Sequence, residues 1–166
     1  MDDVARSILR GLLRERGTAA LATLHDGLPF ASMVPIGVAS TAAGLRLVTH
    51  VSRLAAHTRD MLAAPEVCLL LTAPESAAMP QALPRVSIPA VAKFIPPEHA
   101  DYAAFRAAYL ARHPQAADLF QLGDFSIVAF TPLSARLVAG FGRAHTLKPE
   151  ALAAVAIEGD GSPVVS

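Results

Sequence analysis

Hydrophobic residues recur every three to four positions at the start of the chain, which is the period of an amphipathic helix. We predict this helix over residues 2–16, with Asp2 or Asp3 at its N-terminus and Gly17 as its stop. Its apolar stripe consists of Val4, Ile8, Leu9, Leu12 and Leu13. Three arginines lie largely off the stripe, so we expect one face of the helix to pack against the rest of the protein.

Short apolar runs separated by turn residues follow the helix and predict β-strands. TAALATL and PFASMVPIGVAS flank His25-Asp26-Gly27, a strong hairpin signal. Later strands are expected in LRLVTHV, VCLLLT, RVSIPAVAKFI and FSIVAFTPLSARLVAGFG. Links this short cannot make parallel crossovers, and the runs are apolar or small on both faces. The pattern therefore indicates an α+β fold with a small antiparallel barrel at its centre.

Proline and aromatic positions predict two more helices. The first covers residues 53–64 and ends at Pro65, and the second opens after Pro96 and ends at Pro114. The second helix carries Tyr102, Phe105 and Tyr109 on one side. We expect one domain over residues 1–145, including the first helix, and a C-terminal tail over residues 146–166.

Composition narrows the class of protein. Hydrophobic residues make up 53% of the 166 positions and charged residues 17%, which excludes an intrinsically disordered chain. The formal net charge is zero, so the one-signed surface of a nucleic-acid-binding protein is not expected. An apolar chain without net charge is poorly protected against association, and we therefore expect a homodimer.

Cysteine content and hydropathy bear on the compartment. Cys68 is the sole cysteine, which excludes an intrachain disulfide and a cysteine-based zinc site. No run approaches the ~20 apolar residues of a membrane span. The first residues also lack the continuous apolar segment of a signal peptide. We expect a cytoplasmic protein that does not contact membranes.

The stretch LVTHVSRLAAHTRDM, residues 47–61, gathers polar residues where a predicted strand passes into a helix. Ser52 is expected at the N-cap, and that role alone would explain it. Arg53 in the first turn opposes the helix dipole, whereas a bound phosphate would be favoured by the dipole, the hydroxyl and the guanidinium together. His57 follows one turn later on the same face. These residues leave two interpretations open: a phosphate site, or a surface helix with an ordinary cap.

Other polar residues give weaker signals. The two histidines of that stretch lack the spacing of a helical zinc site, and no metal site is predicted. Asp60 is interpreted as a solvated position and His25 as a surface residue in a turn. The glycines of AGFGRAH suggest a close backbone approach to a strand or a flat ligand, with Arg143 and His145 directed at the same pocket. A bulged strand end explains them equally well.

Together, LATLHDGLPFASMVP, LVTHVSRLAAHTRDM, LPRVSI and ARLVAGFGRAH resemble the pyridoxamine-phosphate-oxidase-like FMN-binding split barrels. The resemblance covers roughly residues 17–145 and is greatest to the branch related to haem-utilisation proteins. It implies a six-stranded antiparallel split β-barrel with flanking helices. It also implies a homodimer with FMN at the subunit interface, each FMN touched by both subunits.

The resemblance also implies roles for individual residues. Ser52 and Arg53 would hold the FMN phosphate, while Thr49 and His50 would approach the ribityl chain or the ring edge. The backbone of Ser32, Met33 and Val34 would run along the isoalloxazine, and further polar groups would come from His57, Arg85 and Arg143. Gly37 departs from the oxidase pattern, which has a basic residue near this place. The substrate-binding C-terminal segment of the oxidase is also unmatched, so oxidation of pyridoxine phosphate is not expected.

Our leading hypothesis is therefore an FMN-binding flavoprotein, related to oxidoreductases and acting on an unidentified small molecule. The sequence assigns no catalytic residue. The alternative is a non-catalytic protein that binds or stores haem or another tetrapyrrole on the same barrel. His50, His57 or His145 would then be the axial ligand. A third hypothesis is a barrel that has lost its cofactor and serves as an interaction domain.

Overall fold

The structure is a computed structural model that describes residues 1–75 and 79–157. Its helices are α1 (Asp3–Glu15), α2 (Ala56–Ala63), α3 (Tyr102–Arg112), α4 (Pro149–Ile157) and the 3-10 helices η1 (Pro80–Ala82) and η2 (Pro114–Gln121). Its strands are β1 (Thr18–His25), β2 (Leu28–Pro35), β3 (Gly37–Thr41), β4 (Gly44–Ser52), β5 (Glu66–Thr72), β6 (Arg85–Ile95), β7 (Phe125–Pro132), β8 (Ala135–Val138) and β9 (Ala144–Leu147). None of the helices in these two ranges combines the length and the apolar character needed to cross a membrane.

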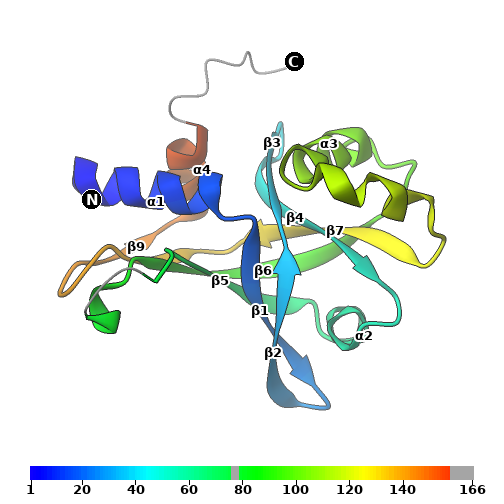
Figure 1. Cartoon of the computed structure of the whole chain (residues 1–166), viewed down its shortest axis with the longest axis horizontal. Coiled ribbons are helices and arrows are strands. Elements are labelled where there is room, and N and C mark those ends of the chain that lie inside the picture. Colours follow the sequence, from blue (N-terminus) through cyan, green and yellow to red (C-terminus); the bar gives the residue numbers. More distant parts are fainter. Residues whose placement is uncertain (76–78, 158–166) are drawn as a thin grey trace.

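The nine strands form one antiparallel sheet that coils without closing. Its order is β2-β1-β5-β6-β7-β4-β3, and β8 and β9 extend the sheet beside β6. The α+β class and the antiparallel split barrel are confirmed. The strand number exceeds the expected six because Ile36 separates β2 from β3, the last predicted run divides after Pro132, and β9 follows it. Figure 1 shows α1 and α4 together at one end of the sheet and α3 beside β3 and β4.

The larger core cluster lies between the sheet and helices α1 and α4. Leu9 and Leu13 of α1 are fully buried there, as are Leu21 and Phe130 of the sheet. The buried residues of α4, at positions 152 and 155, belong to the same cluster. The predicted tail is thus structured as far as residue 157, and residues 158–166 lie outside the described part of the chain. Alanines surround the two buried positions of α4, so the sequence shows little contrast between its faces.

A second core cluster lies under α3 on the other side of β4. Phe105 and Tyr109 are buried in it, which confirms the predicted apolar side of this helix, while Tyr102 is partly buried against it. The helix begins at Tyr102, later than the prolines at 96 and 97 had indicated. Its partners from the sheet are Val48 and Ile127 and the small residues Ala39 and Ala129.

Gly37 allows α3 to approach the sheet closely. A Cβ atom at this position would lie 2.7 Å from the carbonyl oxygen of Ala108 and 2.8 Å from the Cα atom of Tyr109. Both neighbours are backbone atoms of a packed helix and have no flexible end that can move away. The basic residue of the oxidase pattern is therefore replaced here by a residue whose lack of a side chain the packing of α3 requires.

The substitution Gly37→Ala should lower the free energy of unfolding by about 1–3 kcal/mol, because the added methyl group overpacks the α3–β3 contact. Gly123→Ala is the matched control, since a Cβ there meets no atom within 4 Å. Urea unfolding followed by circular dichroism measures both changes. Equal stability of the two variants would contradict the close approach of α3.

Candidate functional site

The polar corner predicted from the sequence lies between the end of β4 and the start of α2. Helix α2 begins at Ala56 with Ala55 at its N-cap, so the prediction of Ser52 as N-cap is wrong. Ser52 instead ends β4, where its hydroxyl accepts a hydrogen bond from the backbone N–H of Leu54 at 3.1 Å. The same hydroxyl donates to the carboxylate of Asp124 at 2.9 Å. A tight turn thus separates the strand from the helix and occupies the hydroxyl.

Asp124 is the second anchor of this corner. Its carbonyl oxygen accepts the backbone N–H of Arg53 at 2.7 Å, while its carboxylate holds Ser52. The guanidinium of Arg53 is exposed, makes no hydrogen bond or ion pair within the described residues, and lines a cavity of about 750 Å³. The cation needed for anion binding is therefore available, but a carboxylate stands next to the hydroxyl that we expected to contact a phosphate.

His57 connects α2 to β2. Its Nδ1 atom lies 3.2 Å from the hydroxyl oxygen of Ser32, and the ring is half-buried. Burial holds the pKa of His57 below its ordinary value of 6.5, so the imidazole is neutral at neutral pH. A neutral imidazole that donates from Nδ1 to Ser32 keeps the lone pair of Nε2 for a ligand.

A polar cluster that the sequence interpretation missed fixes the next turn of α2. Asp60 is 5% exposed, and its carboxylate accepts hydrogen bonds from Thr23 at 2.8 Å and from Nδ1 of His25 at 2.7 Å. The hydrogen bond and the charge of Asp60 raise the pKa of His25. Burial alone would raise the pKa of Asp60, but the bonds from His25 and Thr23 hold it below its ordinary value. The interpretation of Asp60 as a solvated position is therefore wrong. The sequence offered one signal: Thr23 alternates with Ala19 and Leu21 on the buried face of β1, where its hydroxyl needs a polar partner.

Several residues implied by the resemblance lie inside the fold or hold other groups. Val34 belongs to the larger core cluster, and the buried Thr49 donates from its hydroxyl to the carbonyl oxygen of Pro35 at 2.7 Å. The guanidinium of Arg85 donates to the carbonyl oxygen of Leu83 at 3.0 Å.

Arg143 pairs with the carboxylate of Asp2 at the start of α1. Figure 1 shows this end of α1 and helix α2 on opposite sides of the molecule. Arg143 therefore does not join Ser32, Arg53 and His57 around α2.

His50 faces away from Thr49, toward the aromatic residues below α3 and η2. Its ring stacks on Phe120 with centroids 3.8 Å apart and an interplanar angle of 2°. Burial, with a smaller effect from the charge of Arg106, lowers the pKa of His50 to about 4. Both faces of β4 are thus occupied, and His50 is separated from the surface that carries Ser32.

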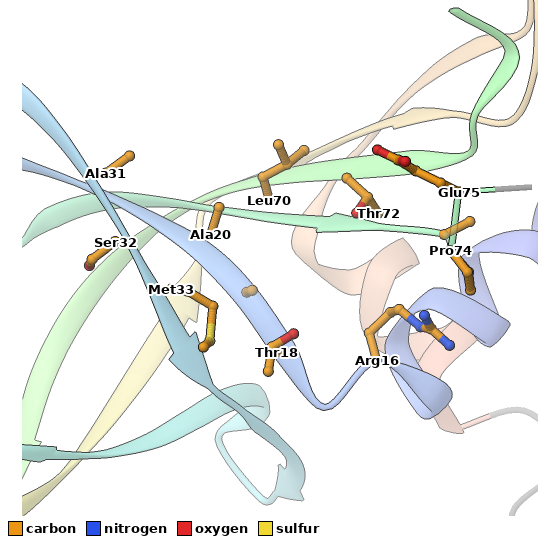
Figure 2. Close-up of a pocket in the computed structure, with 12 residues that line it drawn as sticks. Arg16, Thr18, Ala20, Ala31, Ser32, Met33, Leu70, Thr72, Pro74 and Glu75 are labelled. Atoms are coloured by element: carbon orange, nitrogen blue, oxygen red, sulfur yellow. The ribbon is translucent and has the colours of Figure 1, made fainter. Parts of the chain in front are cut away.

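The outer face of β1, β2 and β5 is open to solvent. A shallow pocket of about 500 Å³ lies there, and Figure 2 shows its lining residues on these strands, with Arg16, Pro74 and Glu75 at one end. Small residues such as Ala20 and Ala31 make this face flat. Strand β2 forms the edge of the sheet and exposes large apolar side chains on both of its faces: Leu28 (70% exposed), Phe30 (40%) and Met33 (67%).

Comparison with known proteins identifies the family from which this arrangement derives. Residues 7–139 match the pyridoxamine 5'-phosphate oxidase family. The chain belongs to this family. The resemblance seen in the sequence, to the haem-related branch of these split barrels, is therefore confirmed.

Three relatives have names that refer to haem. The chloroplastic heme oxygenase HOZ of Arabidopsis thaliana is 36% identical over 120 residues, which are 72% of this chain and 35% of that protein. A heme binding protein from Mycobacterium smegmatis superimposes with a TM-score of 0.81 at 31% identity, over 93% of this chain and 62% of the other. HutZ, the heme storage protein from Vibrio cholerae, gives a TM-score of 0.65 at 26% identity, over 75% and 87%. The chain thus spans about a third of HOZ and less than two thirds of the mycobacterial protein.

The pair of His25 and Asp60 predicts a pH-dependent stability. The contribution of His25 is complete below its ordinary pKa of 6.5 and is lost as the pH rises through the raised pKa. The contribution of Asp60 is present above 3.8 and is lost as the pH falls through the lowered pKa. The variant His25→Gln should therefore lose most stability, relative to the parent, between these values. Urea unfolding at about pH 5 and about pH 9 measures the difference, which should shrink at the higher pH.

His99→Gln is the control for this measurement, because His99 contacts no carboxylate among the described residues. A loss of stability in His25→Gln that is as large at the higher pH as at the lower one would show that the ring contributes packing only.

Proposed function

We propose that this chain is a haem-binding split-barrel protein that works as a homodimer, with His57 as the axial ligand of the iron. The single observation that carries the proposal is the contact of His57 Nδ1 with Ser32, at the corner where the sequence also gathers its polar residues. The printed names of the three relatives support haem as the ligand. Bound haem would supply a redox-active iron, and we propose binding without assigning a reaction to it.

His57 suits an iron ligand better than the other two histidines considered. Metal-bound imidazoles use a neutral ring whose second nitrogen donates to a fixed acceptor, and Ser32 offers that acceptor. His50 is 6% exposed and is covered by stacking on Phe120. His145 lies on β9, beside β8, and its Nε2 atom is buried without a hydrogen-bond partner among the described residues.

The homodimer is proposed from the open face of the sheet. An exposed edge strand with large apolar side chains is prone to pair with another chain unless it is protected by charge or covered. Strand β2 contains no charged residue, and its neighbour β1 exposes Ala20, Ala22 and Leu24 on the outer face. A second copy placed on the outer face of β1 and β2 would cover this surface and Met33, while Ser32 and His57 meet on the opposite face of β2.

FMN is the second candidate ligand, favoured by the free guanidinium of Arg53 at the corner. Two observations oppose it. The carboxylate of Asp124 holds the hydroxyl of Ser52, and α3 fills the space that a basic side chain at Gly37 would need. A phosphate would thus meet one cation and one carboxylate at the corner, which weakens its electrostatic attraction.

The haem proposal predicts that the purified chain develops a Soret band on titration with haemin, and that His57→Ala shifts the band and weakens binding. Ser32→Ala should weaken binding by about 10- to 100-fold, because it removes the group that orients the imidazole. His145→Ala and His50→Ala are the matched controls and should leave the band unchanged. A band that depends on either control histidine would refute His57 as the ligand.

The FMN candidate predicts a different outcome from the same protein. If FMN binds, Arg53→Ala should reduce its affinity by about 1.5–3 kcal/mol through loss of a charge-assisted contact, while Arg59→Ala should have little effect. Quenching of flavin fluorescence measures this affinity. Tight FMN binding combined with no haem binding would replace the leading proposal by the second one.

The dimer has its own test. Met33→Asp places a charge on the exposed outer face of β2 and should convert the dimer into monomers in sedimentation velocity, with an unchanged circular dichroism spectrum. Glu75→Gln, at the end of the same pocket, is the control and should remain dimeric. A parent chain that sediments as a monomer at all concentrations would contradict the proposed assembly.

A further inference from the structure

The structure contains a second cavity, and we propose that it binds a planar aromatic carboxylate, separately from the haem site. The cavity has a volume of about 750 Å³ and lies between α2, the end of β6, the start of α3 and the segment that joins η2 to β7. This volume lies within the usual range for small-molecule sites, about 300–1,000 Å³. The haem proposal does not use this cavity, and the family resemblance bears on one of its residues, Arg53, as a contact of the FMN phosphate.

The walls of the cavity are mostly aromatic and apolar. Four rings from different elements line it: Phe94, Tyr102, Phe120 and Phe125. Leu62, Leu122, Ile95 and Ile127 and the two prolines after β6 complete the apolar surface. Aromatic rings favour flat ligands, which can stack on them or pack against their edges. The lining therefore selects for a planar and largely apolar body.

Phe120 is fixed in place by residues behind the wall. His50 stacks on it at 3.8 Å, and the guanidinium carbon of Arg106 lies 5.0 Å from the centre of its ring. His50 is 6% exposed, and its Nδ1 atom has no hydrogen-bond partner within the described residues. His50 does not line the cavity itself, so its contribution to the wall is the stacking on Phe120. The wall is thus preorganised, which reduces the entropy that binding must overcome.

The charge lining the cavity favours a ligand with a single negative charge, because the nearby carboxylate of Asp124, bound to Ser52 and not among the lining residues, would repel a doubly charged phosphate more strongly. Arg53 is the one charged residue among the described residues that line it, and its guanidinium has no partner among them. Gln121 and Ser126 provide further polar groups along the wall. Because the guanidinium forms paired hydrogen bonds with planar carboxylates, a carboxylate at Arg53 with its ring against the aromatic wall fits the whole lining.

The cavity and the proposed haem site lie on different sides of α2. Thr58 and Leu62, four residues apart, face the cavity, whereas His57 contacts β2 and Asp60 contacts β1. Arg53 precedes the helix and belongs to the cavity side. Two ligands can therefore approach the same helix without sharing a wall residue.

The test uses the full chain with two dyes of similar shape. 8-Anilino-1-naphthalenesulfonate carries an anionic group, and N-phenyl-1-naphthylamine is its uncharged counterpart. We expect both dyes to bind at one site per chain, and 2-naphthoate to displace both.

Arg53→Gln should weaken binding of the anionic dye and of 2-naphthoate about tenfold, because the charge-assisted contact is lost. The affinity for the neutral dye should not change. Arg59→Gln, the matched control on the exposed side of α2, should change neither.

A blocking variant keeps the proposal falsifiable. Ser126→Trp places a large side chain in the cavity and should abolish binding of both dyes, with circular dichroism confirming that the variant folds. Retained binding in Ser126→Trp, or an equal effect of Arg53→Gln and Arg59→Gln, would overturn the proposal. The proposal would also be overturned if each bound haemin displaced one molecule of dye, because the cavity would then belong to the haem site. Failure to bind haemin leaves these dye measurements interpretable, so the two proposals fail separately.

Discussion

The buried carboxylate of Asp60 is the interaction on which the arrangement of α2 depends. Removing an ionised carboxylate from water is unfavourable unless hydrogen bonds replace the lost solvation. Here Thr23 and His25 each donate one hydrogen bond to the carboxylate. Because the donors belong to β1 and the acceptor to α2, the helix cannot rotate or slide along the strand without leaving the carboxylate unpaired. This constraint turns a short helix of eight residues into a fixed element.

Once α2 is fixed, its two sides acquire different environments. The side of His57 is turned to the edge strand β2, where its ring contacts the hydroxyl of Ser32. The side of Thr58 and Leu62 is turned to the aromatic cavity, and the hydroxyl of Thr58 donates to the carbonyl oxygen of Ser52 at 2.7 Å. That bond ties the helix to the corner from which Arg53 extends. Helix α2 therefore links the surroundings of His57 and the aromatic cavity as one rigid element.

The sequence predicted the α+β antiparallel barrel because strand runs and turns are local signals, and it located the polar corner for the same reason. It did not predict which residues of the corner meet. Asp124, which takes the hydroxyl of Ser52, lies 72 positions away in the chain, and Asp60 meets Thr23 across 37 positions. The α4 helix was missed because its alanine-rich faces differ little in hydrophobicity. Pairing across such distances depends on tertiary packing, which hydrophobic periodicity does not encode.

The packing of α3 also bears on the choice of ligand. The glycine at position 37 lets this helix lie on β3, and α3 in turn carries Tyr109, which covers His50, and Tyr102, which lines the cavity. A basic side chain at position 37 would require α3 to move away from the sheet, and the aromatic wall would move with it. The glycine that stands in place of a basic residue thus permits the aromatic wall. The proposals made above therefore attribute the departure from the oxidase pattern to backbone packing, which acts at a distance from the proposed ligand.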